Sequence, residues 1–180
     1  MPNFQHLYAK VDDTFINAVI EIPLNSKAKI EYRIDREIFE IDRFLYPAFS
    51  YPFNYGFIPG TWSEDEDPID IVVISSEPVS TGLIIQVKII GALITEDEEG
   101  IDPKLIALPK GKVDPMFKDV NSVDDLPVIT KDRIKHFYEN YKTIEPGKWV
   151  KVSGWQSKAE ADKTVIEGIA KYEQKFNKSK

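Results

Sequence analysis

An acidic segment that runs directly into a β-branched run limits most strongly what this chain can fold into. Residues 64–70 read Glu-Asp-Glu-Asp-Pro-Ile-Asp, with five carboxylates in seven positions, and Ile71-Val72-Val73-Ile74 follow at once. The β-branched run predicts a buried strand, so several of these carboxylates would be held at its entrance. Like charges 4 Å apart repel by roughly 4 kcal/mol at a protein-surface dielectric of about 20. The segment therefore indicates a fold that brings cations to this end of the strand.

The composition predicts one domain over residues 1–180 and argues against several functions. A hydrophobic content of 42% suffices for a sizeable core, and no apolar stretch approaches the length needed to span a membrane. The net charge of −7 argues against nucleic-acid binding, since phosphate backbones are held mainly by clustered lysine and arginine. The chain lacks cysteine and its first residues do not resemble a secretory signal, so we expect a cytoplasmic protein.

Apolar periodicity predicts an α+β fold, namely a small, mostly antiparallel, closed or nearly closed barrel followed by two C-terminal helices. The predicted strands cover residues 18–22, 28–34, 38–45, 69–75, 83–93, 105–108 and 149–155. Helical spacing occurs only late in the chain. One helix is expected from an N-cap at Thr130, and another from Ser157, where Glu160 completes a capping box. The proline- and aromatic-rich segment 46–62 is predicted to be an ordered loop.

A second acidic island at residues 96–102 strengthens the prediction of a metal site. It contains Asp97 and Asp102, and Lys104 follows it. Taken singly, each acidic run could be a solvated loop, but two runs beside predicted strands can converge. Because every candidate ligand is an oxygen, Mg²⁺ or Mn²⁺ is favoured over Zn²⁺. An EF-hand is excluded, since Ile69 stands where that loop requires an oxygen ligand.

Several further motifs occur in a fixed order between residues 19 and 155. They are Ile-Glu-Ile-Pro at 20–23, Lys-Ile-Glu at 29–31, Ile-Asp-Arg at 41–43, Tyr-Pro-Phe-Asn-Tyr-Gly at 51–56, Asp-Glu-Asp-Pro-Ile-Asp-Ile at 65–71, the segment 97–104, Tyr-Lys at 141–142 and Gly-Lys-Trp-Val-Lys-Val at 147–152. The motif at 65–71 resembles the signature of the family I soluble inorganic pyrophosphatases, and the others resemble that family in the same order. The resemblance implies an OB-like barrel with a five-stranded core.

The resemblance also implies Mg²⁺-dependent hydrolysis of pyrophosphate to two phosphates by a metal-activated water, with several Mg²⁺ ions and Mn²⁺ as a substitute. The implied metal ligands are Glu21, Glu31, Asp65, Asp70, Asp97 and Asp102. The implied substrate-binding residues are Lys29, Arg43, Tyr55, Lys104, Tyr141 and Lys142. Asp67 would orient or deprotonate the attacking water, whereas the role of Tyr51 is left undecided. The family further implies a homo-oligomer, with a hexamer favoured and His136 at a subunit contact.

Three sites depart from the family pattern, and one of them, Ile30 where a tyrosine is common, leaves the charged face of its strand intact. Glu66 replaces a small residue, usually glycine, inside the signature, and the turn at Arg36-Glu37 also lacks the family's usual glycine. If position 66 requires a positive φ, a non-glycine residue there is strained. Glu66 therefore leaves a second function open, a catalytically idle barrel that binds metal or a protein partner. A third function, an oligonucleotide-binding barrel, is disfavoured by the acidic composition.

Overall fold

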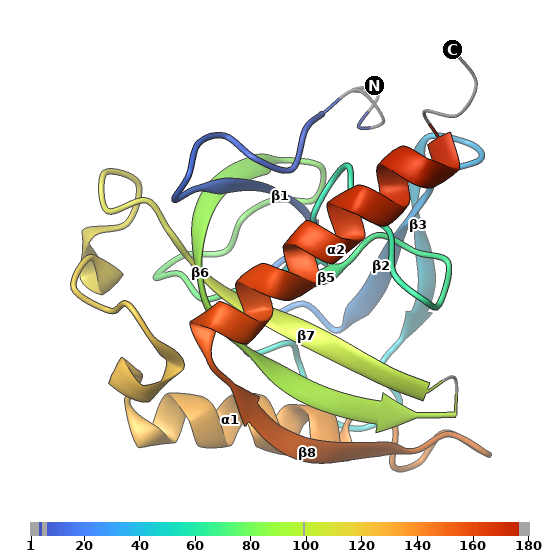
Figure 1. Cartoon of the computed structure of the whole chain (residues 1–180). Helices are drawn as coiled ribbons and strands as arrows, with labels where there is room; N and C mark the ends of the chain where they lie inside the picture. The colour runs from blue at the N-terminus through green and yellow to red at the C-terminus, as the bar shows by residue number, and fades with distance from the viewer. Residues whose placement is uncertain (1–3, 5–6, 99, 177–180) are drawn as a thin grey trace.

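The computed structural model describes residues 4, 7–98 and 100–176 (Figure 1). The strands are β1 (Ile16–Ile22), β2 (Ala28–Arg33), β3 (Ile38–Phe44), β4 (Asn54–Phe57), β5 (Asp70–Val73), β6 (Ile84–Asp97), β7 (Gly100–Pro109) and β8 (Val150–Gln156). The helices are α1 (Val128–Asn140) and α2 (Lys158–Phe176), with short 3-10 helices η2 (Pro115–Phe117) and η3 (Val123–Asp125). Within the described ranges, no helix is long and apolar enough to cross a membrane.

Five strands pair in a closed ring. The main sheet has the order β1-β4-β5-β7-β6-β8, and β1 also pairs with β6, which joins the two sides. Strands β5 and β7 are parallel, while the other neighbouring strands in this ring are antiparallel. Strand β8 extends the sheet from β6. The predicted fold class, a mostly antiparallel five-stranded barrel of OB type with two C-terminal helices, is confirmed.

Strand β5 shows how the β-branched run builds two layers of core. Ile71 and Val73 belong to a cluster that includes Ala161 and Val165 of α2. Val72 belongs to a second cluster, together with residues of α1. Because successive side chains of a strand point to opposite faces, a continuously apolar strand is buried on both sides. Figure 1 shows the result, with α2 lying across one face of the sheet and α1 alongside β8.

Gly56 allows β4 to approach β1 closely. A Cβ atom added at this position would lie 1.9 Å from the carbonyl oxygen of Val19, which real side chains do not permit. The neighbouring Tyr55 is opposite Ile22 and Val72 in the two adjacent strand pairs. The glycine in the Tyr-Gly motif therefore fixes the position of the tyrosine in the barrel wall.

Strands β2 and β3 form a separate two-stranded hairpin. All six residues of β2 are only half-buried. The hairpin is attached to the barrel by an aromatic cluster, in which Tyr32 stacks on Phe57 of β4 with ring centroids 5.6 Å apart, and Phe4 meets Tyr32 edge-on at 5.1 Å. This hairpin projects charged residues toward the barrel without being part of its ring.

Three predicted boundaries are wrong. Strands β6 and β7 continue through the second acidic island, so Asp97 pairs with Gly100 at a hairpin tip instead of lying in a long loop. Helix α1 begins at Val128 after Pro127, and Thr130 lies inside its first turn, where its N–H donates to the Pro127 carbonyl. The segment predicted as loop contains the short strand β4. For β4, β6 and β7, pairing with distant strands overrides the local preference, whereas α1 begins after Pro127, a residue that favours the start of a helix.

Candidate active site

A cavity of about 390 Å³ lies between the barrel and the β2–β3 hairpin. All thirteen site residues expected from the sequence line it. They are Glu21, Lys29, Glu31, Arg43, Tyr55, Asp65, Asp67, Asp70, Asp97, Asp102, Lys104, Tyr141 and Lys142. The lining also includes three charged residues to which the sequence assigned no role, namely Arg33, Glu98 and Lys148. Residues spread from position 21 to position 148 are thus brought to one place by the fold.

One wall of the cavity, the sheet wall, consists of Asp70 on β5 with Asp102 and Lys104 on β7. The parallel register places Ile71 opposite Leu105, so Asp70 and Lys104 are neighbours on adjacent strands. Asp102 and Lys104 are two residues apart and therefore share a face. The Lys104 ammonium group donates hydrogen bonds to the carboxylates of both Asp70 and Asp102. The two acidic islands of the sequence therefore converge on one buried lysine.

Burial and charge set the protonation states on the sheet wall. Burial alone would lower the pKa of Lys104, but the two carboxylates raise it well above its usual value. Burial raises the pKa of Asp102 to about 6. Burial also raises the pKa of Tyr55 well above its usual value, as it raises the pKa of Tyr141. Near neutral pH the cavity therefore offers a fixed ammonium group and neutral phenols, which can donate hydrogen bonds.

Glu21 connects the barrel with the hairpin. It is buried on β1, and one of its carboxylate oxygens accepts a hydrogen bond from the backbone N–H of Tyr32 at 2.7 Å. Burial is the main cause that raises the pKa of Glu21 to about 8. A cation beside this carboxylate would favour its charged form.

The opposite wall, the hairpin wall, carries Lys29 and Glu31 on β2 and Arg43 on β3. Lys29 is 2.5 Å from Glu31. Arg43 pairs with Asp42 and, at 3.0 Å, with the buried Glu145. The hydrogen bond from Arg43 to Glu145 joins residues 102 positions apart, and nothing in the local sequence predicts it. Glu145 thus fixes the direction in which Arg43 points.

The acidic loop, residues 62–67, forms a third side. Asp65 accepts hydrogen bonds from the hydroxyl of Ser63 and, at 3.3 Å, from the backbone N–H of Asp67. Partial desolvation raises the pKa of Asp67 to about 6, and the negative charges of Asp65 and Asp70 add to this effect. Pro68 restricts the backbone of the residue before it to extended conformations. Glu66 has a φ of 65°, so this position does require the left-handed conformation for which glycine is suited.

The fourth side combines the tip of β6 with the segment after α1. Lys142 is nearly buried and lies 2.8 Å from Asp97, and it also lies 3.7 Å from Glu98. Lys148 pairs with Glu98. Two features of the sequence could have identified Glu98 and Lys148 as site residues. Glu98 directly follows Asp97, and Lys148 belongs to the Gly-Lys-Trp motif.

The donor set of this cavity fits hard divalent cations. Its lining contains eight carboxylates and six cationic side chains, which leaves two formal negative charges in excess. All the acidic donors are oxygens, the type that Mg²⁺ prefers. Within residues 4, 7–98 and 100–176, no three acidic or histidine side chains form a ready-made ligand cluster. Lys104 instead bridges Asp70 and Asp102, with its ammonium group between one oxygen of each carboxylate. A metal cation would also favour this position between two carboxylate oxygens.

Tyr51 and His136 are not among the residues that line this cavity. The Tyr51 side chain is buried, with its ring centroid 4.8 Å from that of Phe137. His136 is exposed on α1 and meets Phe49 edge-on at 5.6 Å. Tyr51 therefore packs behind the site, while His136 belongs to a different surface.

Comparison with known proteins assigns the chain to a family. A model described as inorganic pyrophosphatase matches residues 18–173. The chain belongs to the inorganic pyrophosphatase family. The match spans all thirteen expected site residues, so the cavity lies wholly within the part of the chain that characterises the family.

Individual relatives cover nearly the whole chain. The inorganic pyrophosphatase of Aeropyrum pernix is 50% identical over 157 residues, which are 87% of this chain and 89% of that protein. The inorganic pyrophosphatase of Aquifex pyrophilus is 51% identical, with the same coverage. Among solved structures, the inorganic pyrophosphatase from Helicobacter pylori has a TM-score of 0.90 and 42% identity, covering 93% of this chain and 99% of that chain. The one from Thermus thermophilus has a TM-score of 0.91 and 38% identity, covering 96% and 99%.

Proposed function

We propose that this inorganic pyrophosphatase family member hydrolyses pyrophosphate to two phosphates, using Mg²⁺ held in the cavity. The observation that carries the proposal is the convergence of eight carboxylates and six cationic side chains on one cavity of about 390 Å³. A highly charged anion enters such a site only if cations accompany it, because carboxylates alone repel it. The mixed lining is thus suited to an anion that binds together with metal ions.

The carboxylates would hold the metal. We assign this role to Asp65, Asp70 and Asp102 at the junction of the acidic loop and the sheet wall, and to Asp97, Glu21 and Glu31 around it. When bound, Mg²⁺ lowers the pKa of a water molecule and neutralises charge on the phosphoryl group. Lys104 would move from its bridging position toward the substrate when the charges of Asp70 and Asp102 are met by cations.

Asp67 is assigned as the base. It lies on the acidic loop beside the metal-binding carboxylates, and its pKa of about 6 leaves it ionised at neutral pH but basic enough to accept a proton. In the proposed reaction, the attacking water transfers one proton to Asp67 while its oxygen bonds to phosphorus. The bond from that phosphorus to the bridging oxygen breaks, and the second phosphate departs.

The cationic and phenolic residues are assigned to the phosphoryl oxygens. Lys29 and Arg43 would approach from the hairpin wall and Lys142 from the fourth side. Tyr55 and Tyr141, whose phenols stay protonated because burial raises their pKa values, would donate hydrogen bonds. Donors fixed before the reaction stabilise the charge that develops on the leaving phosphate.

Replacement of Asp67 by Asn tests the assignment. We expect phosphate release from pyrophosphate in Mg²⁺ to fall by roughly 10²–10⁴-fold, the usual contribution of a general base. Asp12→Asn is the matched control, because Asp12 is an exposed carboxylate that accepts backbone hydrogen bonds and does not line the cavity. Equal losses in the two variants would refute the role of Asp67. Absence of Mg²⁺-dependent activity in the parent protein would instead favour the idle metal-binding barrel.

We also propose that the chain forms a homo-oligomer, with a hexamer favoured, and acts in the cytoplasm. A second cavity of about 370 Å³ on the α1 side is lined by Phe49, Pro52, Ile129 and His136. Ile129 is 66% exposed there, which suits burial against another copy. Light scattering of the purified protein would test the subunit number, and a monomer at micromolar concentration would contradict this part of the proposal.

A further inference from the structure

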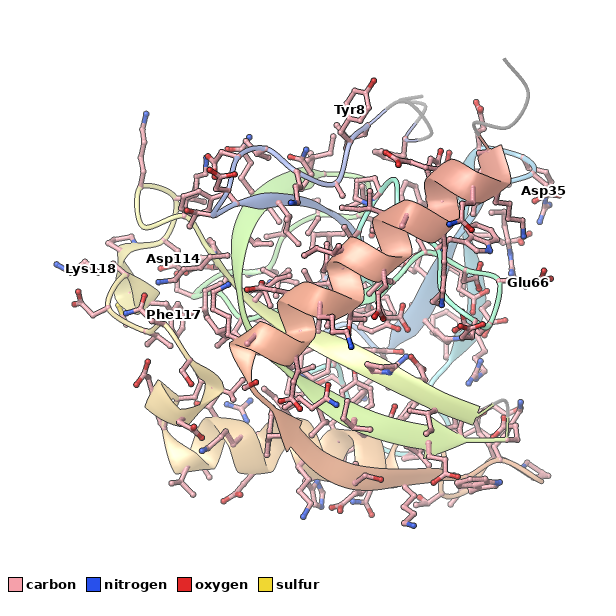
Figure 2. All side chains as sticks on the ribbon, viewed as in Figure 1. Tyr8, Asp35, Glu66, Asp114, Phe117 and Lys118 are labelled. Carbon is pink, nitrogen blue, oxygen red and sulfur yellow. The ribbon has the colours of Figure 1, made fainter. Side chains whose placement is uncertain are left out.

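The side chains of the acidic loop alternate between two environments. Asp65 and Asp67 line the active-site cavity. Glu64 and Glu66 are instead paired with lysines of the C-terminal half of α2. Lys171 lies 2.5 Å from Glu64, and Lys175 lies 3.5 Å from Glu66. Figure 2 shows Glu66 on the outer side of its loop, away from the body of the barrel.

The same part of α2 also holds the start of the loop through its backbone and an aromatic ring. The backbone N–H of Trp62 donates to the carbonyl oxygen of Gly168 at 3.0 Å. The Lys175 ammonium group lies 4.1 Å from the centre of the Trp62 ring, within the range of a cation–π interaction. Phe176 meets this ring edge-on, with centroids 5.1 Å apart. The loop is therefore attached to α2 at both ends of its acidic run.

Gly168 shows how closely α2 lies against the strand that follows the loop. A Cβ atom at this position would be only 2.3 Å from the Cδ1 atom of Ile69, next to the metal-binding Asp70. A hydrogen bond from the backbone N–H of Ile69 to the hydroxyl of Thr61 closes the loop at its base. The helix is thus packed tightly against the residue at which the loop ends.

We propose that the C-terminal half of α2 positions the acidic loop for cation binding. Lys171 and Lys175 hold Glu64 and Glu66 outside the cavity, so that Asp65 and Asp67 face into it. Without this restraint, five carboxylates in seven residues would compete for the same cations in many loop conformations. The inference rests on the proposed function, because it gives a role to residues outside the site that this function requires. Lys171 and Lys175 are positioning residues and not catalytic ones.

Positioning and simple electrostatics predict opposite results when these lysines are removed. Two positive charges near a cation site repel the incoming cation, so their loss would by Coulomb's law strengthen cation binding. If the lysines position the loop, their loss weakens cation binding, because the bound conformation is no longer preformed. The sign of the change in affinity therefore distinguishes the two roles.

The test is Mn²⁺ binding by isothermal titration calorimetry to the double variant Lys171→Ala/Lys175→Ala. We expect the dissociation constant of the tightest ion to rise about three- to tenfold, the size given by two surface pairs acting together. The matched control is Lys158→Ala/Lys163→Ala, which removes two lysines of the same helix that pair with Asp162 and Glu167 within α2. The control should bind Mn²⁺ within twofold of the parent. Unchanged or tighter binding by the first variant would overturn the proposal.

A second measurement is independent of catalysis and of metal. In the chelator-treated protein, hydrogen exchange at the backbone amides of Ser63 and Asp67 should be faster in Lys171→Ala/Lys175→Ala than in the control variant. Equal exchange in the two variants would overturn the proposal. The charge-preserving variant Lys171→Arg/Lys175→Arg should restore both Mn²⁺ affinity and slow exchange. If the parent lacked pyrophosphatase activity while the exchange difference was found, only the proposed function would fail.

Discussion

The sheet wall and the hairpin wall both present charged groups to the same cavity, but they hold them differently. The Lys104 side chain of the sheet wall is 8% exposed and is bonded to two carboxylates. The Lys29 side chain of the hairpin wall is 27% exposed and pairs with Glu31 on its own strand. Strand β7 lies between two other strands of a closed ring, whereas β2 pairs with β3 alone. The same kind of ion pair is thus built once around a buried lysine and once around a half-exposed one.

This difference in exposure indicates which charges contribute to the stability of the fold. A buried charge is costly when its partner is removed, because neither water nor another charge replaces the lost contact. An exposed charge is hydrated when its partner is removed, and the change in stability is small. Charges of the sheet wall should therefore affect folding and function together, and so should Arg43, which pairs with the buried Glu145. The half-exposed Lys29 and Glu31 of the hairpin wall should affect function alone.

The largest expected effect on stability tests the comparison of the two walls at Lys104, the buried lysine of the sheet wall. Replacement of Lys104 by Met leaves Asp70 and Asp102 without their common partner and should lower the free energy of unfolding by about 3–5 kcal/mol. Lys29→Met removes a lysine from the hairpin wall and should cost less than about 1 kcal/mol. Urea denaturation in the presence of a chelator measures both. Equal losses would show that the two walls do not differ in the way their exposure indicates.

The next effect, which is spread over several pH units, concerns Glu21, the residue that connects the barrel with the hairpin. Its pKa is about 8 in the folded protein and 4.5 for the ordinary group, so between these values the folded state binds more protons than the unfolded state. The contribution of Glu21 to stability is therefore complete below about pH 4.5 and declines as the pH rises to about 8, by at most about 1.4 kcal/mol per pH unit.

Glu21→Gln should remove this decline from the metal-free protein, because the amide does not titrate. The measurement is the urea midpoint at several pH values from 5 to 8, and Glu40→Gln, on the exposed hairpin, serves as the control. Parallel curves for the parent protein and Glu21→Gln would contradict the assignment. A stability that rises with pH in the parent would contradict the sign.

The smallest expected effect compares the acidic loop with the hairpin turn. Glu66 and Glu37 have φ values of 65° and 54°, the left-handed conformation for which glycine is suited. Changing either to Gly relieves about 1 kcal/mol of left-handed strain but adds flexibility to the unfolded chain, so a net gain of roughly 0.5 kcal/mol is expected. Asn25, with φ of 69°, is the control, since asparagine tolerates this conformation. Thermal unfolding that shows a loss for Glu66→Gly would mean that its contact with Lys175 outweighs the strain.

The sequence predicted four of the five ring strands, all but β4, and thirteen of the residues that line the cavity, for two different reasons. Continuous apolar strands such as Ile71–Ile74 specify burial locally. The site residues followed from motifs whose order reflects the family. The path of β6 and β7 through Asp97 was missed because acidic residues are poor strand formers, and only cross-strand pairing overrides that preference.

Contacts between residues far apart in the sequence are a second feature that the sequence did not predict. The pairing of Arg43 with Glu145 and the attachment of α2 to the acidic loop join residues about a hundred positions apart. Neither residue of such a pair carries a local signal of its partner. Only the folded arrangement of the barrel, the hairpin and α2 makes these contacts visible.

The closing contact of the ring, between β1 and β6, has a consequence for folding kinetics. It pairs Ile16 with Val87 and Val19 with Ile84. The ring therefore closes only when the chain that follows β1 has brought β6 back beside it. Pairings of this range form slowly, because the entropy of loop closure is lost before the contacts are gained. The proposed cation ligands come from strands on both sides of this closure. Added Mg²⁺ should therefore bind only the finished ring, slow its opening and leave the rate of its formation unchanged.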